Sequence, residues 1–273
     1  MGLSYDFEYD GRYLSSFGYI LCTFDSSGTD TPDSGAKITF TTVSKKNGAK
    51  FFLAGTKYES CIQSQFSICK DPNVYTGEEK YITDIEYREI ARWLNRHQFH
   101  KFKLDDYDDF DGINCYFMAS FNLSKTVLCG RTIGIQLDME TNAPFGYGDV
   151  VTRTISITDA TQNYSVYDPS DDEGYTYPDL KITCSADGDL ELENLTEGVK
   201  MVVKNCVSGE VITIDGETLS IASSVASHRL EKDFNFIFFR IGNTFENRNN
   251  QIKASIPCTI KLSYEPIIKN TPF

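Results

Sequence analysis

Residues 83–102 read TDIEYREIARWLNRHQFHKF and hold the only tryptophan of the chain and two of its three histidines. Thr83 with Glu86 three positions later is the pattern of a capping box, in which each side chain accepts a hydrogen bond from the other residue's free backbone N–H. Ile82 and Tyr87, on either side of this pair, are placed to form a hydrophobic staple. The pattern predicts a helix that begins at Asp84.

One arc of the predicted helix is apolar and the opposite arc is polar. At about 100° per residue, the apolar arc consists of Ile82, Ile90, Trp93, Leu94 and His97, and the polar arc of Arg88, Arg92, Asn95 and Arg96. Trp93, flanked by Ile90 and Leu94, is the side chain that we expect to anchor the helix on the sheet of the first domain. His97 is predicted at the edge of the packing face.

The two histidines of this stretch also suggest a metal site, because His97 and His100 are three residues apart and can share a helix face. A catalytic zinc needs a third protein ligand, however, and the chain has no HExxH motif. The helix is predicted to end near His97, where positive charge interacts favourably with the helix dipole. We therefore predict a capped helix with no metal, no cofactor and no catalytic residue.

Outside this stretch the composition is typical of a β-rich protein. The chain has 19 Phe and 16 Tyr, and short runs of Val, Ile and Thr are separated by Gly, Asn and Asp. Asn47-Gly48 lies between two alternating apolar arms and predicts a long β-hairpin. From Val150 onward, strand-like runs recur without a helix, among them FNFIFFRIG at 234–242, and this pattern is typical of a β-sandwich or jelly roll.

We therefore predict a mainly β protein with one prominent α-helix, in two domains. Residues 1–145 are predicted to form a β-barrel or sheet domain with the long hairpin and the helix, and residues 146–273 a β-sandwich. The boundary is placed at NAPFGYG, residues 142–148, where proline and glycine end the periodic pattern.

The charge and the cysteines exclude several classes of protein. A net charge of −13 argues against direct binding to nucleic acid, which draws its affinity from lysine and arginine. There is no apolar run of about 18 residues that would span a membrane, and the start, MGLSYDFEYDGRYL, lacks the features of a secretory signal. None of the eight cysteines is in a CxxC motif, so we predict buried, reduced thiols rather than disulfides or a zinc site.

Two acidic runs, at residues 105–112 and 168–174, look like calcium loops. In both, the EF-hand register fails because the first and twelfth positions hold no carboxylate. A looser Ca²⁺ site stays open for either run, since hard cations accept varied oxygen ligands. Solvated turns are the interpretation that we favour.

No arrangement for nucleophilic catalysis is found in the sequence. His228, the remaining histidine, has no companion motif and is predicted to lie on the surface between strands. Paired carboxylates for glycoside hydrolysis stay open, because their separation is a tertiary property. We expect that the protein is not an enzyme.

A segment rich in tyrosine allows two interpretations. Its aromatic side chains are Tyr164, Tyr167, Tyr175 and Tyr177. They could stack on sugar rings, as in a β-sandwich lectin, or form a protein interface, because tyrosine supplies contact area at low entropic cost. The sequence does not choose between the two.

Four groups of residues, taken in order, carry a resemblance to a known family. They are FEYDG at 7–11 with SFG at 16–18; EIARWL at 89–94 with FKL at 102–104 and an acidic loop before Tyr116; APFGY at 143–147; and PDLKI at 178–182, IDG at 214–216, DFNF at 233–236 and Arg240. In this order they resemble the distal tail protein (Dit) of siphophages and related phage tail components.

The resemblance implies a structural virion component of the phage tail tip or baseplate, assembled in the cytoplasm of the bacterial host. N-terminal domains would join into a homohexameric ring, and galectin-like C-terminal sandwiches would project outward. The implied partners are other copies of the chain, the tail tube protein, the tape measure protein and the baseplate hub or tail-associated lysin, with a receptor-binding protein in some phages. It also implies that residues 264–273 run back onto the first domain.

The alternative from another class is a carbohydrate-binding, lectin-like protein. In that case the sandwich would recognise host cell-surface glycans, and the first domain would only present it.

Overall fold

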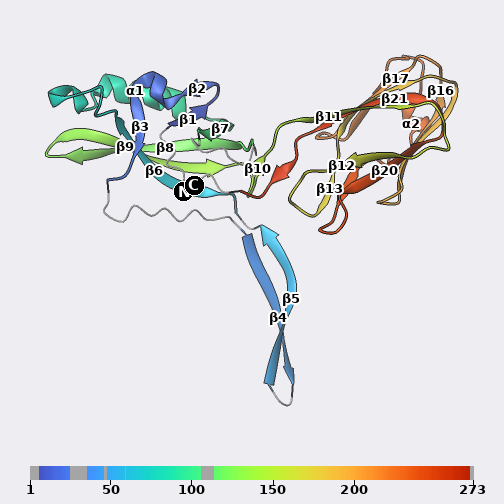
Figure 1. Ribbon diagram of the computed structural model, residues 1–273, viewed down its shortest axis with the longest axis horizontal. Helices are drawn as coiled ribbons and strands as arrows, with labels where there is room; N and C mark the ends of the chain where they lie inside the picture. The colour runs from blue at the N-terminus through green and yellow to red at the C-terminus, as the bar shows by residue number, and fades with distance from the viewer. Residues whose placement is uncertain (1–5, 25–35, 46–47, 59, 106–113, 271–273) are drawn as a thin grey trace. The chain divides into compact units, whose positions relative to one another are not determined.

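The computed structural model describes residues 6–24, 36–45, 48–58, 60–105 and 114–270 (Figure 1). The chain divides into two compact units, Met1–Tyr147 with Lys269–Phe273 and Gly148–Ile268. Each unit has its own buried apolar core. The predicted fold class, mainly β with one prominent helix, is confirmed.

The first unit is built on an open antiparallel sheet of seven strands in the order β2-β1-β7-β8-β9-β6-β3. Since β2 and β3 are the two edges, the chain forms the sheet and not the closed barrel of the prediction. The elements of this unit are β1 (Asp6–Tyr9), β2 (Arg12–Tyr13), η1 (Leu14–Phe17), β3 (Tyr19–Cys22), β4 (Ala36–Lys45), β5 (Gly48–Tyr58), β6 (Gln63–Lys70), η2 (Gly77–Lys80), α1 (Asp84–Leu94), β7 (His100–Asp105), β8 (Phe117–Leu128), β9 (Arg131–Thr141) and β10 (Gly146–Tyr147).

Strand β9 shows why the sheet has one buried face. Ile135, Leu137 and Met139 are buried in the core beneath α1, whereas Gln136 and Asp138, between them, face the other way. Side chains alternate across a strand, so the apolar and polar residues of this sequence separate onto opposite faces. The helix can therefore cover only one side of the sheet.

Strands β4 and β5 form the predicted long hairpin, paired from Ala36 with Tyr58 to Lys45 with Gly48. Asn47, the first residue of the predicted turn, lies outside the described residues. Among the strands that the structure describes, the hairpin pairs with no third strand.

Helix α1 begins at the predicted residue but ends at Leu94, before His97. Asn95 leaves the helical conformation, and the Arg96 side chain turns back to donate to the carbonyl of Trp93 at 2.9 Å. The Arg96 guanidinium also binds Asp10 at 2.9 Å, which draws the chain toward β1. The side chain that the sequence placed on the polar arc thus closes the helix.

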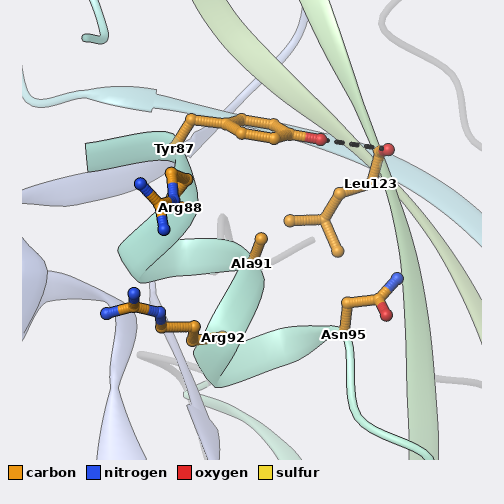
Figure 2. Close-up of a pocket in the computed structure, with 6 residues that line it drawn as sticks. All are labelled: Tyr87, Arg88, Ala91, Arg92, Asn95 and Leu123. Atoms are coloured by element: carbon orange, nitrogen blue, oxygen red, sulfur yellow. Dashed lines mark hydrogen bonds between the residues drawn. The ribbon is translucent and has the colours of Figure 1, made fainter. Parts of the chain in front are cut away.

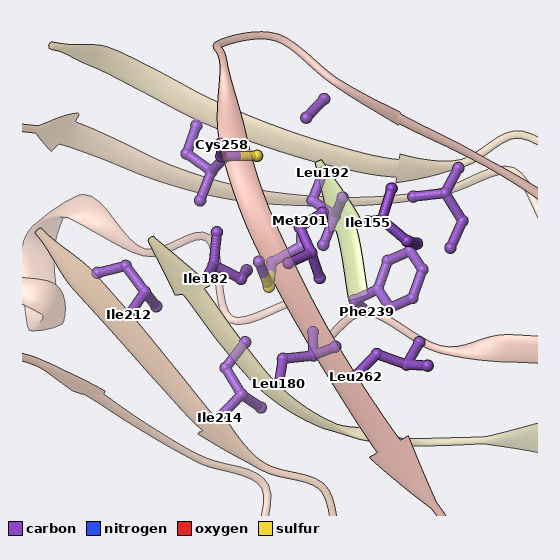
Figure 3. Packing of buried hydrophobic residues seen from close by; sticks show 14 of the residues in the cluster. Ile155, Leu180, Ile182, Leu192, Met201, Ile212, Ile214, Phe239, Cys258 and Leu262 are labelled. Atoms are coloured by element: carbon purple, nitrogen blue, oxygen red, sulfur yellow. The ribbon is translucent and has the colours of Figure 1, made fainter. Parts of the chain in front are cut away.

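The second unit is a β-sandwich, as predicted. A five-stranded sheet, β11-β21-β14-β17-β18, packs on a four-stranded sheet, β12-β20-β15-β16, and β13 pairs with β19. Leu192 and Met201 from the second sheet meet Ile182 and Leu262 from the first between the layers (Figure 3). The elements are β11 (Val151–Ile157), β12 (Tyr164–Tyr167), β13 (Gly174–Thr176), β14 (Asp179–Cys184), β15 (Gly188–Asn194), β16 (Val199–Cys206), β17 (Val211–Asp215), β18 (Ser220–Ser223), α2 (Leu230–Asp233), β19 (Ile241–Asn243), β20 (Asn249–Ala254), β21 (Cys258–Tyr264) and β22 (Ile267–Ile268).

Two predictions for this unit are wrong. A one-turn helix, α2, occurs where no helix was expected. The run at 234–242 is a strand only at its end, because Asn235 uses its own side chain to bond the backbone of β16 at Val202 N–H and the Lys200 carbonyl. Phe236 then takes a positive φ of 57°, which a strand residue does not adopt.

The eight cysteines are free thiols, but the prediction that they are buried holds for only three of them. Cys184, Cys206 and Cys258 are buried in the sandwich. Cys129 is exposed and the others are half-buried. Cys129 lies at the tip of the β8–β9 hairpin with a φ of 51°, a position that the strand-like sequence around it does not reveal.

Candidate functional site

The N-terminus of α1 carries the capping box read from the sequence. Thr83 Oγ1 accepts a hydrogen bond from the N–H of Glu86 at 3.3 Å, and Glu86 Oε2 accepts one from the N–H of Thr83 at 2.8 Å. Lys70, whose side chain is buried, lies 2.6 Å from Glu86 Oε1. Burial opposes the charge of Glu86, but the hydrogen bonds from Lys70 and Thr83 outweigh it and hold its pKa below the ordinary value. The cap thereby also ties the helix to β6.

The apolar arc of α1 faces the sheet, and its three predicted anchors are buried: Ile90, Trp93 and Leu94. The Trp93 indole stacks on Phe17 and Phe7, with ring centroids 4.5 and 5.7 Å away. Its Nε1–H donates to the carbonyl of Tyr9 at 3.0 Å. Trp93 is therefore the side chain that fixes α1 to β1 and η1, which supports the proposal that it is the structural anchor.

The two histidines of the opening stretch lie on different elements. His97 is exposed beyond the end of α1, and His100 begins β7 with Nδ1 3.6 Å from Asp10 Oδ1. They cannot share a helix face, which the HxxH reading required. The hydrogen bond from Arg96 holds the pKa of Asp10 below its ordinary value. Within the described ranges, no three His, Cys, Asp or Glu side chains are grouped as metal ligands.

The outer surface of α1 forms one side of an open groove of about 340 Å³, with β8 on the other side (Figure 2). Its lining residues are Tyr87, Arg88, Ala91, Arg92, Asn95 and Leu123. Ala91 and Leu123 supply an apolar floor, and the Tyr87 hydroxyl donates to the Leu123 carbonyl at 3.3 Å. Arg88 and Arg92 are exposed at the α1 edge of the groove, and in Figure 2 their guanidinium groups extend away from Leu123. Three residues of the polar arc, Arg88, Arg92 and Asn95, thus line a concave surface, which the periodicity alone did not indicate.

The second acidic run is buried at its start and exposed at Asp171 and Glu173. Asp168 is 1% exposed, and its Oδ1 accepts hydrogen bonds from the N–H and hydroxyl of Ser170 and from the Tyr264 hydroxyl. Asn243 donates to the carbonyls of Ser170 and Asp172. The favoured interpretation is therefore wrong for Asp168, which is buried between the nearby Ser170 and the distant Tyr264. Most of the first acidic run lies outside the described residues.

His228 is not the surface histidine that was predicted. Its side chain is 3% exposed, and its Nδ1 lies 2.5 Å from Oε1 of the fully buried Glu210. The Ser223 hydroxyl donates to the same oxygen at 2.5 Å, and Nε2 of His228 lies 3.6 Å from Asp233. Burial opposes the charge of both groups, but for His228 it is outweighed by the bond to Glu210, and for Glu210 by the hydrogen bonds from Ser223, His228 and the Val207 N–H. The pKa of His228 is raised and that of Glu210 is lowered.

The tyrosine-rich segment spans β12 and β13 and presents two exposed rings. Tyr167 and Tyr175 are each about half exposed. The Arg240 guanidinium lies over the Tyr175 ring at 4.1 Å and reaches Glu197 at 3.4 Å, and Tyr177 meets Tyr175 edge-on. With both of these neighbours in place, Tyr175 is still 56% exposed.

None of the described helices has the length and apolar composition needed to cross a bilayer. Among the described residues, the first unit combines an open sheet, the covering helix α1 and the long hairpin, and it has a concave surface on α1. The second unit is a sandwich with an aromatic surface.

Comparison with known proteins gives the class. Residues 3–143 match the phage tail protein N-terminal domain family, and residues 145–264 match the phage tail C-terminal domain family. The chain therefore belongs to this phage tail protein family. The predicted resemblance to phage tail components is thus confirmed.

The fold has relatives among solved structures. It is similar to the SPP1 Dit (gp 19.1) protein, a paradigm of the hub adsorption apparatus in Gram-positive infecting phages, with a TM-score of 0.62 over 96% of this chain and 98% of that chain at 13% identity. Chains of the phage p2 baseplate in its activated conformation, with Sr and with Ca, match at TM-scores of 0.42 and 0.43 and 10% identity, over at least 98% of each chain. These weaker matches carry no argument. No curated protein sequence matches the chain.

Proposed function

We propose that this phage tail protein is a distal tail protein, with a structural and not a catalytic role. Residues 1–145 would form a hexameric ring that links the tail tube to the hub and the host-adsorption apparatus, and residues 146–273 would project from it as a sandwich. The protein would be part of the virion, at the tail tip. The observation that carries this proposal is the likeness of its fold, over 96% of its length, to that of the SPP1 Dit protein.

The hairpin supports an assembled state. Strands β4 and β5, 10 and 11 residues long, have no third strand among the described residues. An isolated two-stranded hairpin is marginally stable in water, and exposed edges of this kind invite pairing with another chain. In a closed ring, a neighbouring subunit would supply the missing contact.

The test is the mass and shape of the purified full chain. Light scattering should give roughly 185 kDa, six times the 30.8 kDa of one chain, and negative-stain images should show rings with a central opening. A strict monomer over a wide concentration range would contradict the proposal. Co-purification with the tail tube protein, the tape measure protein and the hub would then identify the partners.

Glycan binding by the sandwich is a second candidate function. The exposed Tyr175 ring, with Arg240 on one face and Glu197 beside it, is the observation that favours it, because an aromatic face with polar groups at its edge suits a sugar ring. Glycan-array or cell-wall binding by the full chain, lost in Tyr175→Ala and kept in Tyr167→Ala, would support this function. Equal binding by both variants would remove it.

A further inference from the structure

Only some of the charged side chains of α1 have a partner of opposite charge among the described residues. Asp84 pairs with Lys125, and Glu86 pairs with Lys70. Arg88 and Arg92, in contrast, make no ion pair within the part of the chain that the structure describes, although Glu89 lies between them in sequence. Being four residues apart, the two guanidinium groups lie on neighbouring turns of the same helix face.

An open groove lies between these arginines and β8. Its floor is apolar, with Ala91 and Leu123 at the centre, and Tyr87 is held in place by its bond to the Leu123 carbonyl (Figure 2). Lys125, which pairs with Asp84, lies over the Tyr87 ring at 4.7 Å and helps to hold that ring in place. A groove with an apolar floor and two guanidinium groups on one side fits a segment that carries both carboxylates and an apolar side chain.

We propose that this groove, defined by Tyr87, Arg88, Ala91, Arg92, Asn95 and Leu123, binds a carboxylate-bearing segment of a second copy of this chain. The chain carries 39 acidic and 26 basic residues, so a second copy presents mostly negative charge to a basic groove. Arginine binds carboxylates with two parallel hydrogen bonds, which fix orientation as well as charge. The inference rests on the proposed ring, whose closure requires that one surface of a subunit contact a different surface of the next.

A charge-reversal variant tests the groove. The double variant Arg88→Glu/Arg92→Glu should weaken self-association of the full chain by about tenfold or more, measured by light scattering across a dilution series. The matched control is Lys181→Glu/Lys261→Glu, which makes the same change of charge at two exposed, paired positions on the sandwich. The control should assemble as the wild type does. At a dilution where all three proteins are monomers, thermal unfolding should be the same, because the substituted side chains are exposed.

A second variant identifies what occupies the groove. Arg88→Lys/Arg92→Lys keeps the charge and introduces amines that a carbodiimide can join to a touching carboxylate. Assembled from a mixture of isotopically light and heavy chains, this variant should give cross-linked peptides of mixed label that contain residue 88 or 92 and an Asp or Glu. The wild type, with arginine at both positions, should give none there.

The outcomes separate the two proposals. If the charge-reversal variant assembles normally, or if cross-links form only within one chain, the proposal that the groove binds a second copy is wrong. The proposal of a ring is then unaffected. A wild type that remains a monomer overturns both. Cross-links to a different tail protein, in rings that survive charge reversal, would also overturn the second-copy proposal, because another partner would then occupy the groove.

Discussion

Removing the Trp93 side chain should be the most damaging single truncation in the first unit. The indole is 5% exposed and stacks on two phenylalanine rings, and its N–H bonds the Tyr9 carbonyl. Replacing a large aromatic residue in a core by alanine costs about 3 to 5 kcal/mol, because the transfer free energy of the removed atoms is lost and a cavity is left behind. The lost hydrogen bond makes up about 1 kcal/mol of this figure.

Two further variants serve as comparisons for Trp93→Ala. Trp93→Phe keeps a ring against Phe17 and Phe7 but loses the hydrogen bond, so it should cost about 1 to 2 kcal/mol. His100→Ala removes a half-buried ring that meets Tyr9 only edge-on, at 5.7 Å, and should cost less than about 1 kcal/mol.

The assay is urea unfolding at one fixed protein concentration, followed by far-UV circular dichroism. Tryptophan fluorescence cannot be used, because Trp93 is the only tryptophan. The two units have separate cores, so the transition of the first unit should move while that of the sandwich stays in place. Comparable losses from Trp93→Ala and His100→Ala would refute the assignment of Trp93 as the anchor.

Three further predictions concern local structure. Thr83→Ala should cost about 1 kcal/mol by removing the helix cap, and Thr83→Ser should restore most of it in the same urea assay. Because the pKa of His228 is raised, its contribution to stability is present below pH 6.5 and is lost as the pH rises through the folded-state pKa. Because the pKa of Glu210 is lowered, its contribution to stability is lost as the pH falls below about 4.5. Glu210→Gln should therefore abolish the decline of the sandwich transition on the alkaline side, and an unchanged decline would show that another group causes it. Gly216→Ala should cost about 1 to 3 kcal/mol, because a Cβ at this position would collide with the Tyr177 carbonyl; a neutral effect on the thermal midpoint would contradict that packing.

The elements that local sequence could predict are those whose causes lie within a few residues. The start of α1 was predictable to the residue, since the capping box needs only Thr83 and Glu86, three positions apart. The long hairpin and the alternation in β9 followed from side-chain periodicity in the same way. The sandwich was predictable as a class, because short strands separated by turn residues have few other stable arrangements.

The features that only the tertiary structure decided depend on residues far apart in the chain. Helix α1 ends at Leu94 because the Arg96 guanidinium pairs with Asp10, 86 positions earlier. No local sequence pattern predicts that ion pair. The buried side chain of His228 is bonded to Glu210, which directly precedes β17 and lies 18 positions earlier in the chain. The run at 234–242 has the composition of a strand, but the Asn235 side chain forms hydrogen bonds with the backbone of β16. The sequence by itself determined the helix, its capped end, the β architecture and the family; packing between distant segments decided where the helix ends, which ionisable groups are buried, and that Arg88 and Arg92 line a groove.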